Sequence, residues 1–144
     1  MIYKTTSARQ TLALGKKFAK KLRGGKVVAF YGDLGAGKTT FIKGIAAGFG
    51  IKKNITSPTF VLMKVYSVRS RQLAVDRLVH IDCYRINRAS EIMAVGADEY
   101  FNDEKAVVLI EWAEKIKKIL PKKTIKINFF FGEDINHRKI EIKK

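Results

Sequence analysis

The feature that most constrains this chain is a glycine-rich segment, GDLGAGKT, at residues 32–39. It matches the P-loop pattern G-x-x-x-x-G-K-[ST], in which glycines let backbone N–H groups approach phosphate oxygens without a Cβ in the way. The apolar run VVAFY at 27–31 precedes the segment, and a helical pattern follows from 38 to about 48. A strand, a tight turn and a helix in this order point the helix N-terminus at an anion. The segment therefore predicts a nucleotide phosphate site.

The loop residues have separate expected duties toward ATP and Mg²⁺. Lys38 is expected to span the β and γ phosphates as a mobile cation, and Thr39 to offer its hydroxyl to Mg²⁺. The helix N-terminus adds about half a positive charge beside the β phosphate. The residues that we expect to bind the nucleotide from this loop are Gly35, Ala36, Gly37, Lys38, Thr39 and Thr40.

Two acidic residues follow apolar runs that are typical of buried strands. Asp82 comes directly after LVHI at 78–81, and Glu111 comes directly after VVLI at 107–110. Open α/β sheets bind ligands at the carboxyl ends of their strands, so both carboxylates are candidates for the metal site. The alternative interpretation of either acid is a residue that ends a strand or forms a turn. The pattern does not decide how the metal duties divide between them.

The remaining pattern predicts an α/β protein. A capping box formed by Ser7 and Gln10 opens a helix that should end at Gly24 and Gly25. Short helices are expected at 90–96 and 112–120, and strands at 60–66, 73–81, 107–110, 125–131 and 139–142. Strands that alternate with helices early and form hairpins late predict a P-loop NTPase-like three-layer architecture with a mixed parallel and antiparallel sheet. The length predicts one domain over 1–144.

The charge is strongly positive, with 29 Lys and Arg against 13 Asp and Glu, a formal net charge of +16. Residues 1–26 carry eight basic residues and no acid, so a basic surface attractive to RNA or to an acidic protein is expected. The alternative is a lysine-rich surface that is only solvated. Cys83 is the single cysteine, which favours a reducing compartment, and it is expected to act as a small buried hydrophobe. No apolar run approaches the roughly 18 residues of a membrane span, so a cytoplasmic protein is expected.

Four segments together resemble the TsaE family, formerly YjeE, of bacterial ATPases required for threonylcarbamoyladenosine modification of tRNA. They are GDLGAGKTT at 32–40, SPTF at 57–60, HIDCYR at 80–85 and LIEW at 109–112. The resemblance implies catalytic roles for Lys38, Asp82 and Glu111, with Thr39 and Glu111 as Mg²⁺ ligands. It also implies a switch-like loop at 57–59 and nucleotide contacts from Thr11 and Arg138.

The function implied by this resemblance is that of a nucleotide switch. A TsaE protein docks on the TsaB–TsaD complex, which modifies adenosine 37 of tRNA, and resets it through Mg-dependent ATP hydrolysis that is weak in TsaE alone. Direct tRNA contact through the basic surface is a further expectation. Two alternatives remain at this point, a small-molecule P-loop kinase and a basic RNA-binding module. His80 and His137 are expected in core or surface roles, because their spacing does not suggest a zinc site.

Overall fold

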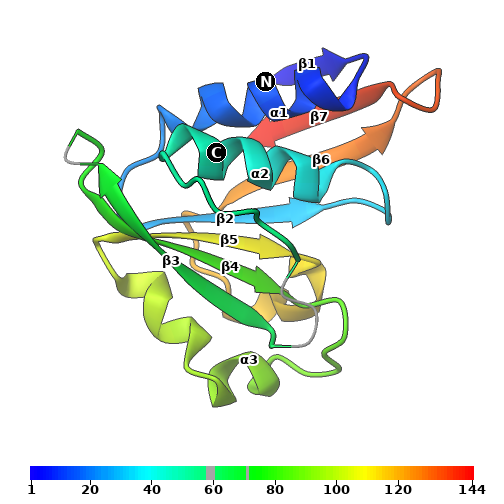
Figure 1. Ribbon diagram of the computed structural model, residues 1–144. Coiled ribbons are helices and arrows are strands. Elements are labelled where there is room, and N and C mark those ends of the chain that lie inside the picture. The colour runs from blue at the N-terminus through cyan, green and yellow to red at the C-terminus, as the bar shows by residue number, and fades with distance from the viewer. Residues whose placement is uncertain (58–60, 71) are drawn as a thin grey trace.

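The computed structural model describes residues 1–57, 61–70 and 72–144. Its centre is a seven-stranded sheet in the order β1-β7-β6-β2-β5-β4-β3 (Figure 1). The strands are β1 Ile2–Thr5, β2 Lys26–Tyr31, β3 Met63–Ser70, β4 Val75–Asp82, β5 Ala106–Glu111, β6 Ile125–Phe131 and β7 Arg138–Lys143. The helices are α1 Ala8–Ala19, α2 Lys38–Gly48 and α3 Ser90–Ala94, with 3-10 helices η1 Ala97–Asn102 and η2 Ala113–Ile119.

The sheet is mixed, as predicted. Strands β4, β5, β2 and β6 run parallel to one another, whereas β3, β7 and β1 each join their neighbour in the antiparallel sense. In the parallel register Glu111 lies opposite both Asp82 of β4 and Phe30 of β2. The carboxyl ends of β4, β5 and β2 therefore meet at one edge of the sheet, and the P-loop leaves β2 at that same edge.

Alternate residues of each central strand enter two separate hydrophobic layers. On β2, Val28 and Phe30 pack into the layer beneath α1 and α2, while Val27 and Ala29 pack into the layer that α3, η1 and η2 cover (Figure 1). Every residue of β5 is buried, as is expected of a central parallel strand with helices on both faces. The three-layer α/β architecture is confirmed. Over the ranges described above, no helix combines the length and apolar character of a membrane span.

The edges of the sheet depart from the expected strands. Strand β1 was not anticipated, because a four-residue edge strand that leaves Ile2 exposed carries a weak alternating pattern. Strand β3 extends to Ser70 through a polar segment that we expected as a connection, since an edge strand tolerates polar residues on its solvent side. The expected start of this strand, Phe60, lies outside the described residues, and β3 begins at Met63.

Two expected helix ranges are also corrected. Helix α1 ends at Ala19 rather than near Gly24, and a turn follows in which Leu22 still packs into the core. The segment 113–119 is a 3-10 helix with a non-helical residue, Ile116, rather than an α-helix that starts at Trp112. Trp112 itself has φ 56° and ψ 41°, a left-handed conformation that an α-helix cannot include.

Helices α1 and α2 approach closely because glycines line their contact. A Cβ added to Gly15 would lie 2.2 Å from the carbonyl oxygen of Phe41, and one added to Gly44 would lie 2.1 Å from that of Leu12. Both obstacles are backbone atoms, which cannot rotate away. This contact fixes α1 against the helix that begins at the P-loop.

We expect Gly44→Ala to destabilise the fold by about 1–3 kcal/mol, because the overpacked contact outweighs the better helix propensity of alanine. Thermal unfolding followed by circular dichroism measures the effect. The neighbouring exposed residue provides the control, since Lys43→Ala removes a solvated side chain and should leave the midpoint nearly unchanged. An unchanged midpoint for Gly44→Ala would show that the helices separate without cost.

Candidate active site

The P-loop connects β2 to α2 through glycines with positive φ. Gly37, which caps α2, has φ 106°, a value that side chains rarely allow. Gly32 has φ 138°, and a Cβ there would lie 2.7 Å from the carbonyl oxygen of Phe129 on β6. The loop can therefore pass close to β6 only with glycine at position 32, which explains the residue that opens the motif.

Lys38 folds back over the loop that it follows. Its Nζ donates hydrogen bonds to the carbonyl oxygens of Gly32 and Asp33, the second at 3.0 Å, and lies 4.1 Å from the centre of the Trp112 ring. Burial lowers the pKa of Lys38, and the nearby carboxylates, Glu111 first among them, oppose that effect. Loop carbonyls thus hold the ammonium group at the place where phosphate oxygens are expected to take over as acceptors.

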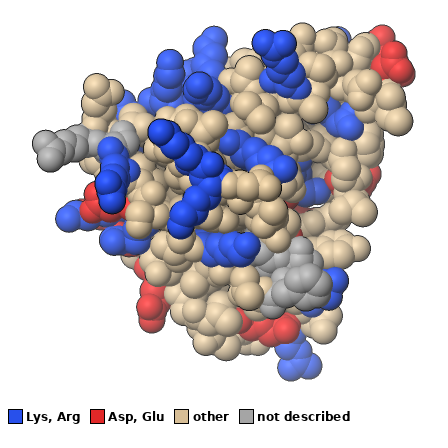
Figure 2. Space-filling model, in the orientation of Figure 1, with Lys and Arg blue, Asp and Glu red and all other residues tan. Residues whose placement is uncertain are grey.

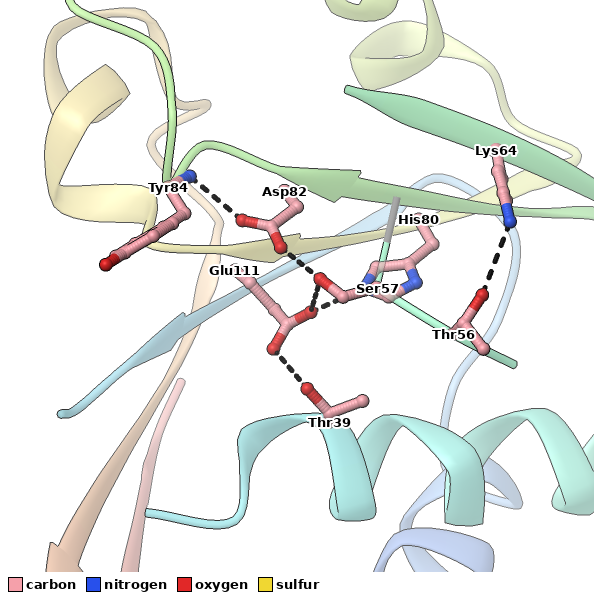
Figure 3. A network of polar contacts seen from close by, with 8 residues as sticks. All are labelled: Thr39, Thr56, Ser57, Lys64, His80, Asp82, Tyr84 and Glu111. Carbon is pink, nitrogen blue, oxygen red and sulfur yellow. Dashed lines mark hydrogen bonds and ion pairs between the residues drawn. The ribbon is translucent and has the colours of Figure 1, made fainter. Parts of the chain in front are cut away.

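Thr39 and Glu111 meet across the sheet edge (Figure 3). The Thr39 hydroxyl donates to Glu111 Oε1 at 2.9 Å, so the two side chains that were predicted as metal ligands from distant segments lie in contact. Ser57 donates to Asp82 Oδ2 and lies 3.4 Å from Glu111 Oε2. The backbone N–H of Tyr84 donates to Asp82 Oδ1 at 2.9 Å. One network therefore joins the P-loop helix, both strand-end acids and the segment before β3.

Glu111 is 2% exposed, yet its surroundings favour the charged form. Burial is the largest influence and would raise the pKa. The hydrogen bond from His80, the hydroxyl of Thr39 and the ammonium of Lys38 together hold the pKa of Glu111 below its ordinary value. Glu111 is therefore a carboxylate over the whole neutral range, as a ligand for a divalent cation must be.

A cavity of about 320 Å³ opens between the P-loop and the ends of β4 and β5. Its described lining residues are Leu34, Gly35, Gly37, Lys38, Thr39, Thr40, Ser57, Asp82, Tyr84, Glu111 and Trp112. The oxygens at its floor are hydroxyls and carboxylates, which are the hard donors that Mg²⁺ prefers. Among the described residues no cluster of three or more His, Cys, Asp or Glu side chains could enclose a metal. This donor set fits Mg²⁺, which commonly takes one or two protein ligands and completes its shell with phosphate and water.

Arg138 and Thr11 lie beside the P-loop and do not line this cavity. Arg138 Nη2 donates to the carbonyl oxygen of Gly35 at 3.0 Å and so ties β7 to the loop. Thr11 is 2% exposed, and its hydroxyl lies 2.7 Å from that of Thr5. Both line a small pocket of about 80 Å³ beside Gly37. Their expected nucleotide contacts stay predictions, and the structure gives both a supporting position against the loop.

The other candidates divide between the core and the site. Ala36 is 1% exposed and Cys83 is fully buried, where burial raises the pKa of its thiol to about 12. The expected switch segment 57–59 is described at Ser57 alone, since 58 and 59 lie outside the described residues. Residues that sequence reasoning did not assign to the site are Tyr84 and His80. The Tyr84 ring packs against Trp112 in a tilted arrangement with ring centres 5.0 Å apart, and His80 is hydrogen-bonded to Glu111.

Comparison with known proteins decides the family. The profile described as "Threonylcarbamoyl adenosine biosynthesis protein TsaE" matches residues 5–140. The chain belongs to the TsaE family. The matched range includes the P-loop, both strand-end acids and Arg138, so every residue of the site lies within the TsaE region.

Relatives from distant bacteria support the same conclusion. The tRNA threonylcarbamoyladenosine biosynthesis protein TsaE of Bacillus subtilis is 41% identical over 87% of this chain and 74% of its own length. That of Haemophilus influenzae is 38% identical over 91% of this chain and 81% of its own length. The crystal structure of Bacillus subtilis YdiB superposes with a TM-score of 0.78 at 34% identity, covering 97% of this chain and 82% of that one.

Proposed function

We propose that this chain binds ATP with Mg²⁺, hydrolyses it, and serves the threonylcarbamoyladenosine modification of tRNA at adenosine 37. The observation that carries the proposal is the contact between Thr39 and Glu111 directly below a P-loop, at the sheet edge where Asp82 also ends. Membership of the TsaE family supplies the biological process. We also propose that residues 1–144 form one domain that acts in the cytoplasm, where tRNA is modified.

Each residue of the site has one proposed duty in hydrolysis. Loop N–H groups and Lys38 hold the phosphates, while Thr39 and Glu111 would hold Mg²⁺. The ion, when bound, would neutralise charge that develops on the phosphate oxygens. Asp82 and Ser57 form the acceptor and donor pair beside that position and would orient the attacking water. Catalysis then rests on positioning and on charge stabilisation rather than on a covalent intermediate.

The site supports only weak hydrolysis without a partner. Of the residues described around the cavity, Lys38 is the cationic side chain, and none is an arginine that could stabilise the transition state. Leu34 and Tyr84 on the cavity lining are 73% and 45% exposed, so they place apolar surface at the opening of the cavity. We therefore propose that the TsaB–TsaD complex docks over this opening and senses the nucleotide.

A capture experiment with immobilised protein tests the docking proposal. TsaB–TsaD should be retained differently in a non-hydrolysable ATP analogue with Mg²⁺ and in ADP with Mg²⁺. Leu34→Asp should reduce capture by about tenfold, since an exposed apolar contact is replaced by a solvated charge. Val95→Asp, which places the same charge at an exposed apolar residue on the opposite layer, is the matched control. Equal capture in both nucleotides would remove the switch from the proposal.

A basic face supports a second, separate contact with tRNA. Lys and Arg side chains gather over α1, α2 and the segment that joins α2 to β3, with acids mainly at the margins (Figure 2). A groove of about 540 Å³ on this side is lined by Lys52, Lys53 and Arg69 together with Tyr66. Its described lining contains no acid, so the groove suits a phosphate backbone.

We expect the double variant Lys52→Glu and Lys53→Glu to weaken tRNA binding about tenfold at low salt and to flatten its dependence on salt. Filter binding at several salt concentrations measures both quantities. The matched control is Lys117→Glu with Lys118→Glu, which changes the charge by the same amount on the exposed side of η2. Equal losses in the two variants would mean that net charge, and not this groove, attracts tRNA.

An assay of phosphate release distinguishes the proposed ATPase from the small-molecule kinase alternative. A small-molecule kinase would release no phosphate unless a hydroxyl acceptor were present, whereas the proposed ATPase releases phosphate to water alone.

A further inference from the structure

His80 lies within an apolar strand at a position where a hydrocarbon side chain would be expected. It stands between Val79 and Ile81 on β4 and is fully buried, with 0% of its surface exposed. Burial of a polar ring costs free energy that an aliphatic residue would not cost at the same place. The residue therefore needs a reason other than packing, and its hydrogen bond to Glu111 supplies that reason.

The register of the sheet brings His80 to Glu111. On β4 His80 and Asp82 are two residues apart and share one face, and on β5 Leu109 and Glu111 do the same. His80 pairs with Leu109 and Asp82 pairs with Glu111, so the imidazole reaches diagonally to the carboxylate. His80 Nε2 lies 2.8 Å from Glu111 Oε2, and both groups are buried (Figure 3).

The hydrogen bonds decide which ring nitrogen carries the proton. An ionised carboxylate only accepts, so Nε2 must be the donor. His80 Nδ1 is buried and has no hydrogen-bond partner within the part of the chain that the structure describes. An N–H at that position would be left without an acceptor, which costs more than a bare lone pair does. The geometry therefore selects the Nε2–H tautomer.

The two oxygens of Glu111 are thereby assigned to different partners. Oε2 accepts from His80, and Oε1 accepts from Thr39 on the P-loop helix. We infer that His80 is a positioning residue that fixes the orientation of the Glu111 carboxylate and so presents Oε1 to the metal position beside Thr39. This inference rests on the proposed role of Glu111 as a Mg²⁺ ligand. Residues that orient a metal ligand through such a bond typically change metal affinity 10- to 100-fold when they are removed.

The test compares ADP affinity with and without Mg²⁺, by calorimetry. His80→Met keeps a side chain of suitable size but lacks the donor, whereas His80→Gln can place an amide N–H near the former Nε2. We expect the Mg²⁺-dependent gain in ADP affinity to fall at least about tenfold in His80→Met. Affinity in EDTA should stay within about twofold of the native value, because the loop amides and Lys38 are untouched. His80→Gln should recover most of the gain.

A double-mutant cycle shows whether His80 acts through Glu111. In a Glu111→Ala background, His80→Met should cause no further loss of the Mg²⁺-dependent gain. Equal losses with and without Mg²⁺, or additive losses in the cycle, would overturn the inference. If the native protein itself shows no Mg²⁺-dependent gain, the proposed metal role of Glu111 fails and the inference falls with it. A different outcome is a folded His80→Met protein that keeps the full Mg²⁺-dependent gain in ADP affinity. That result would contradict the inference about His80 and leave the proposed metal role of Glu111 intact.

A measurement on the unaltered chain covers the case in which His80→Met does not fold. Long-range ¹H–¹⁵N correlation NMR distinguishes histidine tautomers, and the chain has only two histidines. His137→Gln leaves the His80 signals for assignment. We expect the Nε2–H pattern for His80, and an Nδ1–H pattern would contradict the hydrogen bond on which the argument depends.

Discussion

Replacing Lys38 with alanine should lower the affinity for ATP by about 100-fold or more and bring hydrolysis below detection. The ammonium group is the cation that lines the described part of the cavity, and it already bonds to two loop carbonyls that would give way to phosphate oxygens. Hydrogen bonds to charged groups contribute about 1.5–3 kcal/mol each, and about 1.4 kcal/mol corresponds to a tenfold change in affinity. Two such bonds to the β and γ phosphates account for the expected loss.

Trp112 offers a direct readout for this experiment. It is the only tryptophan, and the Lys38 ammonium lies 4.1 Å from the centre of its ring. Nucleotide that draws Lys38 away should change the emission of the native protein, while Lys38→Ala should show a changed starting emission and no titration in the same range. Lys43→Ala, five residues further along α2, is the control with the same charge change. ATP affinity equal to native in Lys38→Ala would contradict the assignment.

Replacing Glu111 with alanine should reduce hydrolysis by about 100-fold or more while leaving nucleotide binding in EDTA largely intact. A divalent ion contributes several kcal/mol of charge stabilisation to the transition state, and each 1.36 kcal/mol is a factor of ten in rate. Glu111 is the buried carboxylate in contact with Thr39, so its removal deprives the ion of the carboxylate that is proposed to bind it. Steady-state phosphate release over a range of Mg²⁺ concentrations measures the loss.

The biological consequence of the same change can be followed in cells. A strain that lacks this gene should lose threonylcarbamoyladenosine from its tRNA, and a native copy should restore it whereas Glu111→Ala should not. Mass spectrometry of digested tRNA gives the modified nucleoside directly. Immunoblotting must show equal amounts of both proteins, because a buried residue is being changed. Full restoration by Glu111→Ala would remove this residue from the proposed function.

The central fold was predictable because its signals are local. VVAFY, the P-loop and the helix that ends at Gly48 form one continuous pattern, and each of these elements is found where the pattern places it. The edges were less predictable, since β1 is too short for a clear alternation and depends on pairing with β7. The 3-10 helix after Trp112 was mistaken for an α-helix, because its apolar spacing does not reveal the left-handed conformation at its start.

The site could be predicted in its parts but not in its connections. The P-loop and the two acids that follow apolar runs can be recognised in the sequence. Parallel strands bring the carboxyl ends of the strands, and so these acids, to one edge of the sheet. The bond between His80 and Glu111 depends on the register of β4 against β5, which the sequence pattern leaves open. The pocket that Thr11 and Arg138 share with Gly35, Gly37 and Thr40 likewise depends on tertiary packing, and their nucleotide contacts stay predictions.

The central claim is that the P-loop, Thr39 and Glu111 form one receptor for the triphosphate and its ion. A crystal structure of the protein with a non-hydrolysable ATP analogue and Mg²⁺ tests it most directly. The account predicts that Lys38 Nζ leaves the carbonyls of Gly32 and Asp33 for the β and γ phosphates, with the metal bound by Thr39 and Glu111. A fully formed complex in which Lys38 still bonds to those carbonyls, and the phosphates lie elsewhere, would contradict it.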